Sequence, residues 1–181
     1  MNKWLKTFLL LTQIGGGLIG LGIIGRVLLA GNLSPIGMII NGTFGLVFAF
    51  GILAGVALIK KERLGIILSL IFQCIQIPII ITPAIAYVFS SGAFLNIFWQ
   101  HGGWGTRFAF LGSTYYCYLN GGQPFCAGVN IVALVLFGFL ARELWLSIAS
   151  YHWTNVEVDD EIQLSQPTES PKPSLAESLR S

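Results

Sequence analysis

Long runs of apolar residues, separated by short polar connectors, set the pattern of this chain. Four such runs are at least as long as the roughly 20 residues that a helix needs to cross a bilayer core of about 30 Å. They are residues 7–30, 36–59, 64–90 and 128–149. The pattern therefore predicts an all-α fold, an integral membrane bundle of four transmembrane helices.

Composition agrees with lipid as the surrounding medium. Of the 181 residues, 54% are hydrophobic and only 10% are charged, whereas soluble domains carry about a quarter charged residues. We expect one transmembrane domain over residues 1–150. From Tyr151 the chain is polar, acidic and rich in Ser and Pro, so residues 151–181 are expected to form a disordered cytoplasmic tail. Either a solubilising extension or a partner-binding segment fits such a tail.

Basic residues predict the orientation of the bundle. Six lie at the ends of the runs that would share one side of the membrane: Lys3, Lys6, Lys60, Lys61, Arg63 and Arg142. Only Arg26 and Arg107 fall toward the other side. By the positive-inside rule both termini are cytoplasmic and residues 91–127 form an external loop. The shortness of this loop favours a cell membrane of the bacterial inner-membrane type.

Neutral polar residues recur inside the apolar runs and form a candidate polar seam. Its members are Gln13, Asn41, Gln73, Gln76 and Asn130, together with Arg26, the one charged residue well inside a predicted span. Amides facing hydrocarbon are costly, so these side chains should point inward and pair across helices. They are either structural contacts or the lining of a solute path. Arg26 is either an interfacial anchor that reaches the headgroups or a contact for an anion.

Small residues predict close helix contacts. Gly16-x-x-x-Gly20 and Gly51-x-x-x-Gly55 allow two backbones to approach, within one bundle or across a homodimer. Pro78 and Pro83 are expected to kink the third helix, since each removes a backbone donor.

The predicted external loop is rich in aromatic residues and holds two cysteines. If Gly121-Gly122 forms a two-residue turn, Cys117 and Cys126 lie opposite each other in a non-hydrogen-bonded pair. An external location favours oxidation, so we expect a disulfide-clamped hairpin between the third and fourth helices. A redox-active pair is the functional alternative, although catalytic dithiols usually have two intervening residues rather than eight.

Several function classes lack the residues they need. His101 and His152 are isolated, so no metal site, nucleophile–base pair or cofactor site is expected. No basic cluster is large enough for nucleic acid. Apart from Glu143, beside Arg142 at the end of the fourth run, no acidic residue lies in the apolar runs, which argues against proton-coupled transport.

The remaining hypothesis is a non-enzymatic accessory subunit that presents residues 91–127 to a membrane-protein partner. The alternative is a small oligomeric channel or carrier for a neutral or anionic solute, with the seam as its path. A membrane thiol oxidoreductase using Cys117 and Cys126 is a third class.

Overall fold

A computed structural model describes residues 1–31, 33–100, 102–119, 122 and 124–164, with side chains as far as residue 149. Contacts divide the chain into two units, Met1–Trp145 and Leu146–Ser181. The candidate functional site lies in the first unit.

The first two apolar runs form helices as expected. The first is continuous through α1 (Lys3–Leu10), a π-helical segment η1 (Leu11–Gly15) and α2 (Gly16–Leu29). The Thr12 hydroxyl donates to the carbonyls of Phe8 and Leu9, a local bond that competes with the helical ladder where the π segment begins. Helix α3 (Pro35–Lys60) is capped by Ser34, whose side chain accepts from the Gly37 amide. Pro35 suits the first helical position because its missing N–H has no intrahelical partner there.

The third run does not form one transmembrane helix. Helix α4 (Glu62–Gln76) ends there, and the chain continues as β1 (Pro78–Ile81) and β2 (Ile85–Gln100). Pro78 cannot donate to a helical bond, and the β-branched residues that follow it favour strand. At 15 residues, or about 22 Å, α4 is shorter than a bilayer core.

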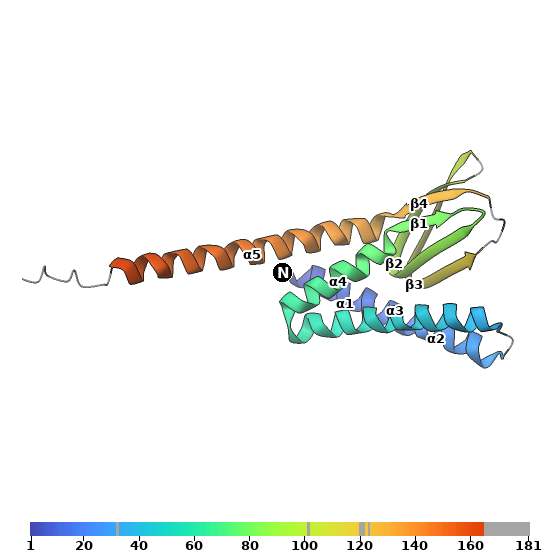
Figure 1. Ribbon diagram of the computed structural model, residues 1–181, viewed down its shortest axis with the longest axis horizontal. Helices are drawn as coiled ribbons and strands as arrows, with labels where there is room; N and C mark the ends of the chain where they lie inside the picture. The colour runs from blue at the N-terminus through green and yellow to red at the C-terminus, as the bar shows by residue number, and fades with distance from the viewer. Residues whose placement is uncertain (32, 101, 120–121, 123, 165–181) are drawn as a thin grey trace, which may run out of the picture. The chain divides into compact units, whose positions relative to one another are not determined.

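The expectation for residues 91–127 is also wrong, because most of this segment is strand. Strand β3 (Gly103–Leu119) pairs with β2 over nearly its whole length, and β4 (Cys126–Asn130) follows. The last helix, α5 (Ile131–Leu164), begins directly after β4. Over the described residues the fold is therefore mixed α/β, with four helical segments and a four-stranded antiparallel sheet, and not an all-α four-helix bundle (Figure 1).

Three helices in the described part of the chain are long and apolar enough to cross a membrane: Lys3–Leu29, Pro35–Lys60 and Ile131–Ala149. The backbone of residues 151–164 is helical as part of α5. The disorder expected for residues 165–181 falls outside the described residues.

The sheet is folded back on itself by a bend in the β2–β3 hairpin. The register shifts between Gly92 and Phe94, where Gly92 has φ +81° and Leu111 of β3 has φ 55°. Before the bend β2 pairs with β1, and after it β2 pairs with β4. Because β1 also pairs with β4, each of the strands β1, β2 and β4 pairs with the other two. Strand β3 pairs with β2 along its other edge.

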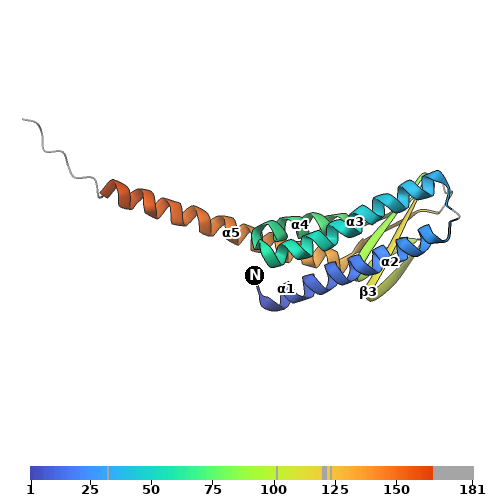
Figure 2. The same ribbon diagram turned by 90° about the horizontal axis from the view of Figure 1, so that it is seen from below.

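Two apolar clusters hold the first unit together. One joins α1, α3, α4 and α5 through Leu9, Leu58, Ile66, Leu136 and Leu140. The other packs the sheet against helices, and its buried members are Ile24, Phe44, Phe48, Phe72 and Phe89. Phe89 of β2 lies 5.1 to 6.0 Å, between ring centroids, from the three other phenylalanines. Figure 2 shows α2 and α3 running alongside the strands that they cover.

The expected disulfide hairpin does not form. Cys117 pairs with Tyr87 of β2, whereas Cys126 pairs with Ile81 of β1 and Gln100 of β2. Strands β3 and β4 are separated by β2, and both thiols are free. The proposed turn at residues 121–122 includes residues outside the described part, but the register of the flanking strands excludes the pairing.

Candidate functional site

Three members of the polar seam meet where the helices touch the bend of the sheet. Gln13, Gln73 and Gln76 are at most 3% exposed. Ser69 donates to Gln13 Oε1 (3.2 Å), and Gln76 Nε2 donates to Gln73 Oε1 (3.5 Å). Gln76 Oε1 accepts the backbone N–H of Ser91 on β2 (2.7 Å). Gln13 Nε2 is buried and has no hydrogen-bond partner among the described residues. The bonds that do form join η1 to α4 and α4 to the bent strand, which favours a structural role over a solute path.

Asn130 lies at the junction of α4, α5 and β2 and is fully buried. Its Oδ1 accepts the N–H of Ala133 in the first turn of α5 (3.3 Å) and the N–H of Leu95 on β2 (3.4 Å). Its own backbone N–H donates to the Ile77 carbonyl at the end of α4 (2.9 Å). The side chain thus caps α5 and ties it to the sheet.

Asn41 and Arg26 lie apart from this junction. Asn41 is buried on α3, donates to the Gly37 carbonyl and accepts from the Tyr115 hydroxyl at 2.6 Å. Arg26 is exposed near the end of α2, beside a cavity of about 270 Å³ that Ile23, Val27 and Ala30 also line. The predicted seam is therefore divided among separate places in the fold.

The glycines predicted to permit close contacts do so within one chain. Gly16 abuts Gly92 at the bend of the sheet, where a Cβ on Gly16 would lie 2.6 Å from Gly92 Cα and 2.7 Å from Ser91 Oγ. Gly20 faces the ring of Phe48, and Gly51 faces the ring of Phe72. The Ser113 hydroxyl donates to the Gly16 carbonyl (2.6 Å), which secures the second strand of the hairpin to α2.

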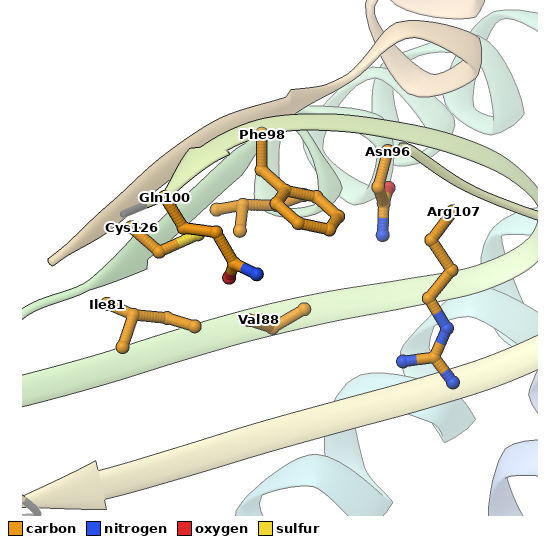
Figure 3. A pocket seen from close by; sticks show the side chains of 8 residues that line it. Ile81, Val88, Asn96, Phe98, Gln100, Arg107 and Cys126 are labelled. Atoms are coloured by element: carbon orange, nitrogen blue, oxygen red, sulfur yellow. The ribbon is translucent and has the colours of Figure 1, made fainter. Parts of the chain in front are cut away.

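A cavity of about 150 Å³ lies in the fold of the sheet. Its apolar lining comes from Ile79, Ile81, Val88 and Phe98, and its polar lining from Asn96, Gln100 and Arg107. Cys126 completes the lining. Figure 3 shows Asn96, Phe98 and Gln100 projecting from β2 on the side where Val88 and Ile81 lie, with Arg107 beside Asn96 and Cys126 beside Gln100.

The opposite face of the same hairpin arm carries exposed aromatic side chains. Trp99 pairs with Trp104, and Phe108 follows on the same face four residues later. The Phe125 ring meets Trp99 edge to face, with ring centroids 6.3 Å apart. Trp104 is 79% exposed and Phe108 is 68% exposed. We call Trp99, Trp104, Phe108 and Phe125 the aromatic surface.

The cysteines lie on opposite faces of the sheet. Cys117 packs beside Tyr87 and Tyr115 in the cluster that contacts the helices, whereas Cys126 lines the cavity. Burial raises the pKa of the Cys126 thiol, which disfavours the nucleophilic thiolate. Burial also raises the pKa of Tyr87 to about 12, so its hydroxyl stays protonated and keeps donating to the Ile75 carbonyl.

We predict that Cys117 and Cys126 remain unlinked after purification under air. Their positions on separate faces prevent bond formation without a change of register. Alkylation of the denatured, unreduced protein should label Cys74, Cys117 and Cys126 in mass spectra, and reduction beforehand should not alter the pattern. A non-reduced peptide joining residues 117 and 126 would contradict the described sheet order.

Sequence reasoning did not identify the cavity or the face to which Arg107 belongs. The sequence identifies Arg107 only as an external charge and does not distinguish Asn96 or Gln100. The alternation of residues in 103–119 was an available signal for a strand. The pairing of Arg107 with Asn96, in contrast, depends on a register that crosses the bulge.

Comparison with protein-family models, curated proteins and solved structures gives no significant match to this chain.

Proposed function

We propose that this protein is a non-enzymatic interaction subunit embedded in a cell membrane, which presents its aromatic surface to a second membrane protein. The observation that carries the proposal is the exposure of Trp99, Trp104, Phe108 and Phe125 together on one face of the sheet. Clustered exposed apolar side chains mark interaction sites, and Trp dominates the energetics of many interfaces.

The three apolar helices support membrane anchoring. The α-amino group of Met1 lies 3.2 Å from a carboxylate oxygen of Glu62 and 3.3 Å from one of Glu143. These ion pairs bring the start of α1, the α3–α4 connection and α5 to the same end of the first unit. Two hydrogen bonds raise the pKa of this amino group, and the bond to Glu62 contributes more than the bond to Glu143. The shared end fits the basic-residue count, and we propose that it is cytoplasmic.

The sheet lies toward the opposite end of the first unit, near the connection between α2 and α3. The Phe89 cluster joins it to Ile24 of α2 and Phe44 of α3, toward the outer ends of these helices in the proposed orientation. A partner that meets the aromatic surface would therefore do so at or near the external membrane face, where Trp is favoured.

The aromatic surface is tested by matched Trp→Ser substitutions. Trp104→Ser should lower recovery of a co-purifying partner about 10-fold or more, the scale of losing one interface hot spot. Trp4→Ser is the control, because Trp4 is 83% exposed but lies in α1, outside the aromatic surface. It should leave recovery unchanged.

The partner is detected by photo-crosslinking in native membranes from a probe at Thr106. This residue is exposed and lies between Trp104 and Phe108 on the same face. A discrete cross-linked product that is lost with Trp104→Ser supports the proposal. A lone monomer in mild detergent with no cross-linked product, or equal cross-linking in both variants, refutes it.

A further inference from the structure

The cavity in the folded sheet has the chemistry of a site for a small organic anion. One end presents the Arg107 guanidinium beside the Asn96 amide, whereas the Gln100 amide lies at the other end, next to Cys126 (Figure 3). Aliphatic and aromatic side chains of β1 and β2 line the cavity between these ends. A ligand that contacts Arg107 and this apolar lining has a charged head and a short apolar body.

No internal counter-ion accounts for Arg107. Among the residues with described side chains, the carboxylates are Glu62 and Glu143, and both pair with the Met1 amino group. In the described part of the chain no hydrogen bond or ion pair links Arg107 to a protein acceptor. A guanidinium presents two parallel donors that match a carboxylate, so Arg107 can bind a carboxylate without giving up an internal partner.

The neighbouring amide is held in position. Asn96 pairs directly with Arg107 across β2 and β3 and is 3% exposed. Its side chain exchanges hydrogen bonds with Ser90 at 3.3 and 3.4 Å, which fixes the amide at the edge of the cavity. Arg107 is exposed, so the charged end is open to solvent.

Two glycines make room for the apolar lining. Phe98 pairs with Gly105 on β3 and with Gly128 on β4. A Cβ on Gly105 would overlap the Phe98 ring, and one on Gly128 would lie 2.6 Å from Phe98 Cβ. The absent side chains let Phe98 lie across both neighbours as one wall. The cavity volume of about 150 Å³ is close to that of an apolar cavity known to accept benzene.

We infer that the folded sheet binds a small monocarboxylate with a ring or branched chain of about six carbons, its carboxylate on Arg107 and its apolar body between Phe98, Val88 and Ile79. The size follows from comparison with the benzene-binding cavity. This inference does not rest on the proposed partner, since the aromatic surface is on the other face of the hairpin.

Binding is tested on the full chain in detergent by calorimetric titration with benzoate. Arg107→Gln should weaken benzoate binding about 10- to 100-fold, the scale of losing a hydrogen bond to a charged group. The Arg26→Gln variant loses the same positive charge at a different cavity, so it should bind benzoate as tightly as the wild type does. Benzamide has the same ring without the charge, and should bind wild type at least about 10-fold more weakly than benzoate.

A second measurement does not depend on calorimetry. In a Cys74→Ser, Cys117→Ser background, benzoate should slow alkylation of Cys126, which lines the cavity. The same concentration of benzamide should give less protection. Absence of benzoate binding, equal affinity for benzoate and benzamide, unchanged affinity in Arg107→Gln, or unprotected Cys126 would each overturn the inference.

Discussion

Gly16→Ala is expected to lower the free energy of unfolding by about 3 kcal/mol, the upper part of the range for overpacking a close contact. The added methyl group would meet the backbone of Gly92 and the Ser91 hydroxyl. A flexible side chain can rotate away from such a contact, but Gly92 cannot yield without moving the bend of the sheet. Ser91 is additionally held there by Gln76.

Gly22→Ala is the matched control in the same helix. A Cβ at Gly22 has no neighbour within 4 Å, and Ala is favoured over Gly in a helix by up to about 1 kcal/mol. The control should therefore be neutral or slightly stabilised. Both variants are compared with wild type by titration with a denaturing detergent, followed by circular dichroism. Equal stability of the two variants would show that α2 and the β2 bend do not touch.

The contrast between the two glycines separates what the sequence could predict from what it could not. The Gly16 and Gly20 spacing correctly predicted a close approach, because small residues are favoured where backbones meet. The partner of Gly16, however, is strand β2, in a segment for which the sequence predicts the end of a helix and the start of a loop. Length and hydropathy cannot distinguish one long apolar helix from a short helix followed by buried strands.

Local chemistry did contain the missing signal in the third apolar run. The apolar run predicts Pro78 and Pro83 as kinks in a continuous helix, although these prolines bracket three consecutive isoleucines. Proline at a strand start and β-branched residues after it favour β structure over helix. The helix–strand boundary at residues 76–78 was thus within reach of sequence reasoning.

The disulfide error has a different origin. The two-residue turn predicted for 121–122 treats residues 117–126 as an isolated hairpin. In the structure β2 lies between the two cysteine-bearing strands and pairs with both. Long-range pairing, which a local turn motif does not encode, decides the neighbours of Cys117 and Cys126. The cavity beside Arg107 depends on the same pairing and was therefore equally hidden.

The second large effect is expected for Asn130→Ala, with a loss of about 2–4 kcal/mol. The change removes a helix cap, which costs about 0.5–2 kcal/mol. It also leaves the N–H of Leu95, on a partly buried strand, without its acceptor, which costs a further 1–3 kcal/mol or so. The two losses coincide because one oxygen serves both α5 and β2.

Ser34→Ala isolates the contribution of capping alone. Ser34 also caps a helix, α3, through a single bond to Gly37, but this bond is exposed and water can replace it. Its loss should cost about 1 kcal/mol or less, within the lower range for such caps.

Detergent titration of the Asn130→Ala and Ser34→Ala variants compares their stabilities, and hydrogen exchange at the Leu95 amide gives a local readout. Asn130→Ala should accelerate exchange at Leu95, whereas Ser34→Ala should not. If the two variants lose equal stability and Leu95 stays protected, then Asn130 serves only as a cap, and the junction of α4, α5 and the sheet depends on apolar packing instead.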